Sequence, residues 1–521
     1  MRSLPLVSCL LMVAACGVAD PADQVDDDGK SDSFDSSAAK ARETKVAAKF
    51  ASASASELKT LVGKLPKGGD LHMHLTGAAT IESMIKLGQG DNDCVTSALT
   101  AATGSMCTSG TTALTSASSG SSLWNQIVGA WSMEGFTTAG ITDRHTHFFD
   151  TFGKFGIIAR VHTAEMLADV RRTAAASNVS YLEVMISLGS GTGSDLGEAY
   201  LTAGDAWTAT KFAAAKKAIL ADPKTATMIS RTSGDIDSWE KTEDTLLGCD
   251  GSHAEPACDV TVRYLVQGKR IASRESVFGQ FVGGFALAQA DSRVVGVNLV
   301  QAEDDSTAIK NYHDQMTAIA WVISDAKSSG KPVQVSLHAG ELNSQFATAA
   351  NLKFHVQEAV DAGASRIGHG VDILGEDNAD ALMSEMAAKH VAVEACLTSN
   401  QQLLGTEGTA HPAKTLIHKY VPVVFATDDE GVLRTDMNGE FIRAFSKQGL
   451  TYKEVKKTIR ASLTYSFLPG TRLRDIAGCR KSLIAESLDS TCKTALSHSE
   501  RAAAEWKLET DLDAFEKAVT Q

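Results

Sequence analysis

The 521-residue sequence predicts a (β/α)8 barrel, in which eight parallel strands form a closed ring inside a layer of helices. Eight short, apolar, β-branched runs end in polar or glycine residues, and helix-like segments separate them. Histidines and acids follow the ends of four runs, where barrel proteins place their sites. The eight runs are residues 69–75, 180–187, 260–267, 294–300, 333–338, 366–370, 391–397 and 421–427.

Composition supports these assignments. The runs at 391–397 and 421–427 are almost continuously apolar, which is typical of parallel strands that are buried on both faces. Residues 307–328 carry apolar side chains at three- and four-residue spacing, and residues 41–65 are rich in Ala, Lys and Glu, so both are expected to be helical. A doubly wound parallel sheet is the alternative architecture.

The barrel domain is expected to span residues 45–521. Two segments interrupt the alternation, near 88–122 and near 235–258, and we interpret both as loop elaborations beside the barrel. The tail from about residue 494 places Leu508, Leu512, Phe515 and Val519 at helical spacing, which predicts a packing helix.

The N-terminus has the pattern of an export signal. Arg2 precedes an apolar run that is too short to span a bilayer, and Val-Ala-Ala-Cys at 13–16 resembles a bacterial lipobox. Residues 1–15 are therefore expected to be a signal peptide, and residues 16–44, rich in Asp and Ser, a disordered tether. This predicts an exported protein that contacts a bacterial cell-envelope membrane only through a lipid on Cys16. A secreted or periplasmic protein with an ordinary signal is the alternative.

Mass spectrometry of the mature N-terminus tests this prediction. We expect removal of residues 1–15 and a lipid on the Cys16 thiol, because small residues precede that cysteine. A mature chain that begins well beyond Cys16 would exclude the anchor.

The remaining cysteines form three close pairs and a lone Cys396, once Cys9 and Cys16 are assigned to the signal region. In an exported protein such pairs favour local disulfides, although some can stay reduced. The pairs are Cys94 with Cys107, Cys249 with Cys258, and Cys479 with Cys492.

The formal net charge of −14 argues against a nucleic-acid partner, because phosphate contacts need a basic face. A small neutral or cationic molecule is the expected partner, and the oligomeric state, including a homodimer, stays open.

The first chemical motif is His72-Met-His74 on the first predicted strand. Residues i and i+2 of a strand face the same side, so both imidazoles can reach one metal ion. A second His-x-His, at His145 and His147, lies in a helical context, where residues two apart point in different directions. We expect that pair to have a structural or surface role.

Two further strands end in histidine. The fifth run ends at His338, followed by Ala, Gly340 and Glu341, which places an acid beside a metal ligand as hydrolysis requires. The alternative is that Glu341 begins a helix. The sixth run ends at His369 between glycines, and its alternative is a hydrogen-bonded core histidine.

Three acids, Asp428, Asp429 and Glu430, follow the last strand. Adjacent carboxylates repel one another unless a cation is present, so metal binding explains their placement better than a solvated turn does. Three histidines and one aspartate suit one Zn²⁺ per chain, with a position left for water.

These motifs resemble the adenosine deaminase family. The resemblance rests on Leu-His-Met-His-Leu, Ser-Leu-His-Ala-Gly-Glu, Arg-Ile-Gly-His-Gly and Thr-Asp-Asp, in this order, and it runs from about residue 65 to 469. Residues 294–300 and 397–403 also resemble family segments. The elaborated N-terminal region with its export signal is similar to the secreted, growth-factor-like branch.

The resemblance implies a role for each residue. It makes His72, His74, His338 and Asp428 the zinc ligands. It makes Glu341 the proton donor to purine N1, for which burial must raise its pKa. His369 would orient and help to deprotonate the attacking water.

The resemblance also implies the substrate contacts. Asp429 would hydrogen-bond purine N7, and Thr76, Gly77 and Gln301 would lie beside the nucleoside. Thr76 stands where the family often has an aspartate that binds the ribose 5′ hydroxyl, and Gln301 stands where a glycine is common.

The sequence therefore predicts zinc-dependent hydrolytic deamination of adenosine or a related 6-aminopurine nucleoside, with ammonia as the second product. Deamination or hydrolysis of adenine, a modified adenosine or a cyclic amide is the enzymatic alternative. A cell-surface binding module with incidental activity is the third, and the complete acid-base set argues against it.

Overall fold

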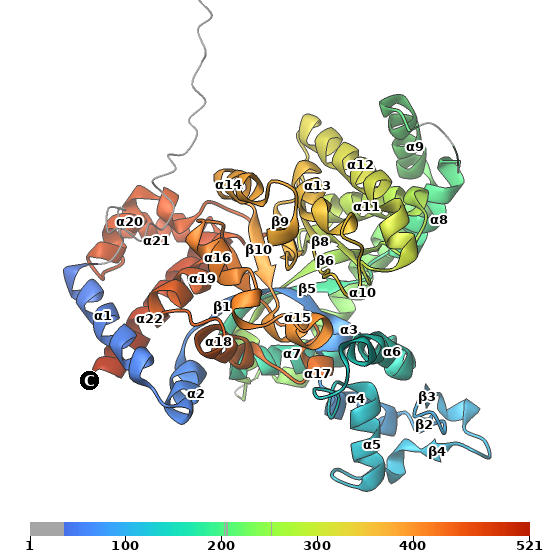
Figure 1. The fold of residues 1–521 in the computed structure, drawn as a ribbon, viewed down its shortest axis with the longest axis horizontal. Helices are drawn as coiled ribbons and strands as arrows, with labels where there is room; N and C mark the ends of the chain where they lie inside the picture. The colour runs from blue at the N-terminus through green and yellow to red at the C-terminus, as the bar shows by residue number, and fades with distance from the viewer. Residues whose placement is uncertain (1–35, 203, 205–206, 252) are drawn as a thin grey trace, which may run out of the picture.

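The computed structural model describes residues 36–202, 204, 207–251 and 253–521, and it contains the predicted eight-stranded barrel (Figure 1). Each barrel strand pairs in parallel with the next in chain order. The strands are β1 (Gly68–His74), β5 (Val179–Ile186), β6 (Thr261–Lys269), β7 (Val294–Val300), β8 (Gln334–Ala339), β9 (Arg366–His369), β10 (Ala392–Ala395) and β11 (Val423–Phe425).

The first and last strands meet at residues that the sequence singled out. The His74 N–H donates to the Asp428 carbonyl at 3.0 Å, and the Asp428 N–H donates to the His72 carbonyl at 2.9 Å. These two bonds connect β1 to the segment after β11 and close the ring, which distinguishes a barrel from the doubly wound alternative.

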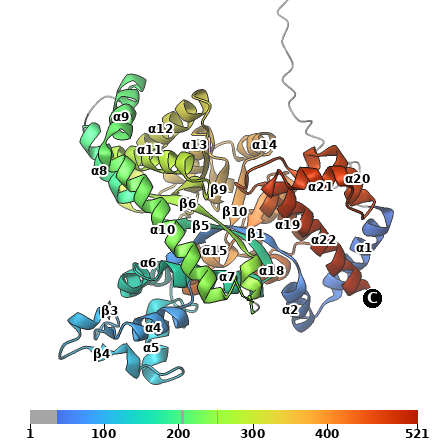
Figure 2. The ribbon, with the colours of Figure 1, turned by 180° about the vertical axis from the view of Figure 1, so that it is seen from behind.

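Helices follow the strands and surround the barrel in both views (Figures 1 and 2). The predicted helix at 307–328 is confirmed as α12. Between β5 and the end of the barrel the helices are α8 (Ser190–Tyr200), α9 (Ala209–Ala221), α10 (Pro223–Leu247), α11 (Arg274–Ala290), α12 (Ser306–Ser328), α13 (His355–Asp361), α14 (Ala379–Lys389), α15 (Leu397–Leu404), α16 (Ala413–His418), α17 (Glu430–Leu433), α18 (Met437–Ser446) and α19 (Tyr452–Thr464).

A long elaboration separates β1 from β5 and projects from the barrel (Figure 1). A three-stranded antiparallel sheet, in the order β3-β2-β4, lies within the expected loop at 88–122, and the Cys94–Cys107 disulfide fastens it. The helices and strands between β1 and β5 are α3 (Leu75–Ala78), α4 (Ile81–Gly90), β2 (Cys94–Val95), β3 (Ala101–Ala102), β4 (Thr112–Ala113), α5 (Ser122–Trp131), α6 (Ile141–Ala159) and α7 (Thr163–Ala176).

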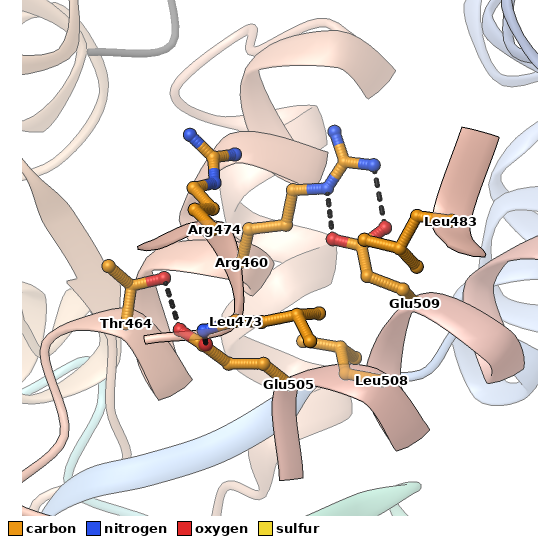
Figure 3. A pocket seen from close by; sticks show the side chains of 8 residues that line it. All are labelled: Arg460, Thr464, Leu473, Arg474, Leu483, Glu505, Leu508 and Glu509. Atoms are coloured by element: carbon orange, nitrogen blue, oxygen red, sulfur yellow. Dashed lines mark hydrogen bonds and ion pairs between the residues drawn. The ribbon is translucent and has the colours of Figure 1, made fainter. Parts of the chain in front are cut away.

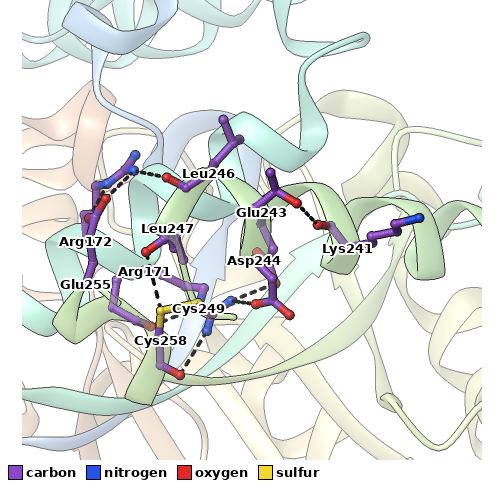
Figure 4. Close-up of a disulfide and its surroundings, with 12 residues drawn as sticks. Arg171, Arg172, Lys241, Glu243, Asp244, Leu246, Leu247, Cys249, Glu255 and Cys258 are labelled. Atoms are coloured by element: carbon purple, nitrogen blue, oxygen red, sulfur yellow. Dashed lines mark hydrogen bonds and ion pairs between the residues drawn. A yellow bond between two sulfur atoms is a disulfide. The ribbon is translucent and has the colours of Figure 1, made fainter. Parts of the chain in front are cut away.

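The second elaboration is largely helical, contrary to the expectation of a loop at 235–258. Helix α10 runs through Leu247 and buries Ile236, Glu243 and Leu247 on one face, a helical period that its polar composition obscured. Beyond α10, the Cys249–Cys258 disulfide closes a turn, as predicted (Figure 4).

The N-terminal tether was predicted to reach residue 44, but helix α1 (Ser37–Ser52) begins inside that range. The Ser36 hydroxyl caps α1 by accepting the Ala39 N–H at 3.1 Å, and Phe50 stacks on Tyr452. Composition predicted a helix from residue 41, and burial of this apolar face stabilises a helix that begins at Ser37. Helix α2 (Ala55–Lys64) follows. The expected signal peptide, Cys16 and tether residues 16–35 lie outside the described residues.

The predicted packing helix of the tail is present as α22 (Glu500–Thr520), which buries Leu508, Leu512 and Phe515. Arg460 of α19 makes a two-pronged ion pair with Glu509 of α22, with one bond at 2.7 Å to each carboxylate oxygen (Figure 3). The third predicted disulfide, Cys479–Cys492, joins α20 (Ala477–Ile484) to α21 (Ser490–Leu496).

Within the described part of the chain, no helix is both long enough and apolar enough to cross a bilayer.

Candidate active site

Three histidines from two strands meet at one end of the barrel. His72 and His74 lie at the C-terminal end of β1, and His338 lies near the end of β8. The Nε2 atom of His338 is 3.1 Å from Nε2 of His72 and 3.2 Å from Nε2 of His74. Strand alternation sends both β1 histidines into the barrel mouth, as the His-x-His spacing predicted.

Asp428 completes the set. Its Oδ1 atom lies 3.3 Å from His74 Nε2 and 3.7 Å from His72 Nε2. His72, His338 and Asp428 are almost fully buried. Three imidazole nitrogens and one carboxylate oxygen within reach of a common point form a donor set that suits Zn²⁺.

The Nδ1 contacts of His72 and His338 explain why the Nε2 atoms of these two rings can face a cation. Nδ1 of His72 is 2.7 Å from Glu394, and Nδ1 of His338 is 2.9 Å from Asn298 Oδ1. Each of these oxygens accepts the Nδ1 proton and leaves the lone pair on Nε2. The residues present therefore fit a zinc ion.

Glu394 belongs to a buried charge network behind the site. Arg366 of β9 donates to both Glu394 of β10 and Glu183 of β5, and all three side chains are buried. Burial alone would raise the pKa of Glu394, but the Arg366 charge and the hydrogen bond with His72 outweigh it and lower the pKa to about 2. Glu394 therefore stays ionised and fixes the His72 ring.

Replacing Arg366 with methionine is expected to lower the free energy of unfolding by about 3–5 kcal/mol, because two buried carboxylates lose their counter-charge. Chemical denaturation measures the effect. The control is Arg172→Met, since Arg172 pairs with Glu255 in an exposed setting, where about 1 kcal/mol or less is expected. Equal losses in the two variants would contradict the assigned network.

Glu341 lies beside the metal set. Its Oε2 atom is 3.6 Å from Nε2 of His369, and its side chain is 12% exposed, so it can meet a ligand from the barrel mouth. Burial, and then the charges of Asp428 and Glu303, raise the pKa of Glu341 well above its usual range. This shift favours the protonated form of the carboxyl.

The turn that carries Glu341 is fixed from below. Gly340 has φ +75°, a conformation that glycine adopts without strain, and its N–H donates to Glu303 at 3.1 Å. The Glu341 N–H donates to the other Glu303 oxygen at 2.9 Å. Glu303 thus holds the backbone on both sides of the bend.

His369, the last residue of β9, and Asp428, three residues after β11, both have a positive φ, +69° and +63° respectively. Residues that carry a Cβ atom rarely adopt this conformation, and such positions concentrate at functional sites. The bend turns both side chains into the barrel mouth. Burial, the main cause, lowers the pKa of His369 to about 3, so its ring is neutral.

The three acids after β11 separate in space. Asp428 joins the metal set, whereas Asp429 lies against Gly77, where a Cβ atom would stand 1.9 Å from its Oδ1. Burial, and then the Asp428 charge, raise the pKa of Asp429 well above its usual range. Glu430 begins α17 and is buried. It is not one of the four residues that could share a metal ion.

The other residues predicted to contact the substrate are Thr76, Gly77 and Gln301. Thr76 and Gly77 follow the first motif on α3. The Gln301 side chain is engaged elsewhere, because its Oε1 accepts the Ile271 N–H at 3.0 Å.

The second His-x-His motif has structural contacts, as expected. His147 of α6 is 2.8 Å from the Ser132 carbonyl and stacks on Phe136. His145 stacks on Phe346 and lies 3.5 Å from Asp304. Neither ring joins the metal set.

Sequence reasoning missed the supporting residues. Glu394, Glu183 and Asn298 each stand in an otherwise apolar barrel strand and are fully buried. A polar residue inside such a strand needs a partner, and that was the available signal. Asn400 and His411, which lie behind His369, were also missed.

The fold and side chains together define a class: a (β/α)8 barrel with three histidines and an aspartate that could hold a metal ion at the carboxyl ends of its strands. The sequence pattern of the family described as "Adenosine deaminase" matches residues 147–479. The chain belongs to the adenosine deaminase family, which confirms the resemblance. The narrower likeness to the growth-factor-like branch stays a prediction.

Similar proteins differ in sequence identity to this chain and in the share of each chain that is covered. An adenosine deaminase of Escherichia coli (strain SE11) is 34% identical over 141 residues, which cover 27% of this chain and 39% of that relative. An adenine deaminase structure from Arthrobacter aurescens has a TM-score of 0.45 at 15% identity and covers 81% of this chain and 98% of that chain. An N6-mAMP deaminase structure from Arabidopsis has a TM-score of 0.45 at 18% identity, with 81% and 97% covered.

Proposed function

We propose that this protein is a hydrolase that removes the 6-amino group of adenosine or a related 6-aminopurine nucleoside. The observation that carries the proposal is the position of Glu341 and His369, which converge on the same barrel mouth as the four-residue metal set. A binding module has no need of a protonated acid beside a metal-binding set.

We propose that His72, His74, His338 and Asp428 hold one Zn²⁺. When bound, the ion supplies Lewis-acid chemistry that lowers the pKa of an attacking water toward neutrality. Glu394 and Asn298 keep the His72 and His338 rings oriented for this role.

Glu341 donates a proton to the purine N1 while water adds to C6. Its raised pKa keeps that proton available at neutral pH. The ring passes through a tetrahedral C6 and then releases the amino group as ammonia, which leaves the 6-oxo product. His369 faces the attacking water, and Asp429, held protonated by its surroundings, is placed to donate to N7.

Substrate choice is tested by incubating the zinc-loaded protein with adenosine, deoxyadenosine, adenine and AMP. We expect loss of the adenine ultraviolet band and release of ammonia with the nucleosides. Chelated protein, then reloaded with zinc, is the control for metal dependence. Conversion of adenine or AMP alone would replace the nucleoside assignment, and no turnover at full zinc content would contradict deamination.

Thr76 is the reason to include several substrates. It offers a hydroxyl where many family members offer a carboxylate to the ribose, so sugar recognition by this chain is set by different contacts.

A further inference from the structure

A hydrogen-bonded series of three groups behind His369 fixes the position of its ring proton. Nδ1 of His369 is 3.0 Å from the Asn400 side-chain nitrogen, and the Asn400 oxygen is 3.0 Å from Nε2 of His411. His411 Nδ1 lies 3.2 Å from the Ala413 backbone nitrogen. All three side chains are buried, and they come from β9, α15 and the turn before α16.

The backbone end of this series removes the ambiguity of the ring protons. The Ala413 N–H can only donate, so His411 Nδ1 must be the acceptor. Burial lowers the pKa of His411 to about 4, so the ring is neutral and its single N–H is on Nε2. That N–H donates to Asn400 Oδ1, and the Asn400 amide group therefore donates to His369 Nδ1.

From this we infer that His369 is held with its proton on Nε2 and presents this N–H as a hydrogen-bond donor to the attacking oxygen, while the proton that the water loses goes to the Glu341 carboxylate, which has given its own proton to N1. Asn400 and His411 are the positioning residues. The inference rests on the proposed function for its catalytic part, whereas the ring state rests on the hydrogen-bond geometry and the burial of these side chains.

The other tautomer of His369, with its proton on Nδ1, would make two N–H groups face each other at one of two places. For His369 to present a lone pair at Nε2, the Asn400 amide would have to turn its oxygen toward Nδ1. Its NH2 group would then face the His411 N–H, and moving that proton to Nδ1 would oppose the Ala413 N–H. Each arrangement leaves a buried donor without an acceptor, which is costly.

The surroundings of His369 Nε2, which faces the site, agree with this assignment. Nε2 of His369 has no hydrogen-bond partner among the described residues, although it is buried. It lies 3.6 Å from Glu341 Oε2 and borders the metal set, since the His369 and His72 rings are 4.9 Å apart between centroids. A donor aimed at this space meets the oxygen that adds to C6, where negative charge develops.

Nitrogen NMR of the zinc-loaded, ¹⁵N-histidine-labelled protein reads the ring state directly. The expected result is a neutral His369 with Nδ1 unprotonated and Nε2 protonated, assigned by its loss in His369→Gln. A wild-type spectrum with the proton on Nδ1 overturns the inference, whatever the activity.

Asn400→Asp reverses the ring state with almost no change of shape. A carboxylate only accepts, so it draws the His369 proton to Nδ1 while still accepting from His411. We expect the NMR signature to invert and kcat to fall about 100-fold or more at unchanged zinc content, since a wrong histidine tautomer can cost about 10⁴-fold in turnover. Gln401→Glu, which adds the same charge at the next, partly exposed residue of α15, is expected to stay within a few-fold.

An inverted signature with turnover within a few-fold of the wild type would overturn the donor role. If no substrate is turned over by any form of the protein, the proposed function fails, and the NMR result still decides the ring state.

Discussion

Replacing His338 with alanine is expected to abolish both zinc binding and turnover. His338 Nε2 is the contact common to His72 and His74, so its loss leaves no central ligand between the two β1 histidines. Four ligands from three sequence-distant segments are reduced to three, two histidines and an aspartate, which form a weaker and more open set. Zinc per chain, measured by elemental analysis after dialysis, and ammonia release together report the effect.

The matched control is His147→Ala, which removes the second histidine of the other His-x-His motif. That ring contacts the Ser132 carbonyl and Phe136 instead of the metal set, so zinc content should stay at one per chain. Stoichiometric zinc in His338→Ala would contradict the ligand assignment.

Replacing Glu341 with glutamine is expected to lower kcat by about 10² to 10⁴ while zinc content and substrate binding largely persist. The amide keeps the shape and the hydrogen bond but has no proton to transfer to the ring. Glu341 is not within the four-residue metal set, and its pKa is raised by burial first, as a proton donor requires. Steady-state kinetics at matched zinc content separate kcat from KM.

Glu385→Gln, which removes a carboxylate from the exposed side of α14, provides the control and should keep wild-type kinetics. Loss of zinc in Glu341→Gln would make this residue a ligand instead of an acid. Turnover within a few-fold of the wild type would require a mechanism built around another acid.

Much of the fold could be read from local patterns. All eight predicted strands are present within a few residues, because apolar runs bounded by polar residues are a local signal of buried parallel strands. The predictions failed where burial comes from distant partners. Helix α1 begins at residue 37, inside the predicted tether, because it packs through Phe50 on Tyr452, and residues 235–247 are helical although their composition is polar.

The site was likewise predictable in part. His72 and His74 lie outside the family match at 147–479, so their assignment rested on strand spacing and on the resemblance of the short motif around them, and the structure brings them to His338. Gln301, placed beside the substrate by resemblance, stays a prediction, because the contact of its side-chain Oε1 with the Ile271 N–H does not involve the backbone N–H that the resemblance assigns to the substrate. Side-chain direction after a strand depends on neighbouring loops, which one segment does not encode.

The sequence by itself determined the strand order, the residues that could bind a metal ion, the three cysteine pairs and the membership of a family, because each is carried by residue type at short spacing. Only the tertiary structure decided which polar residues hold these side chains in place. Glu394, Arg366 and Glu183 come from three strands, and Asn400 and His411 approach His369 from separate segments. Such networks form because a closed barrel excludes water, so each buried polar atom must find a partner from another strand or loop.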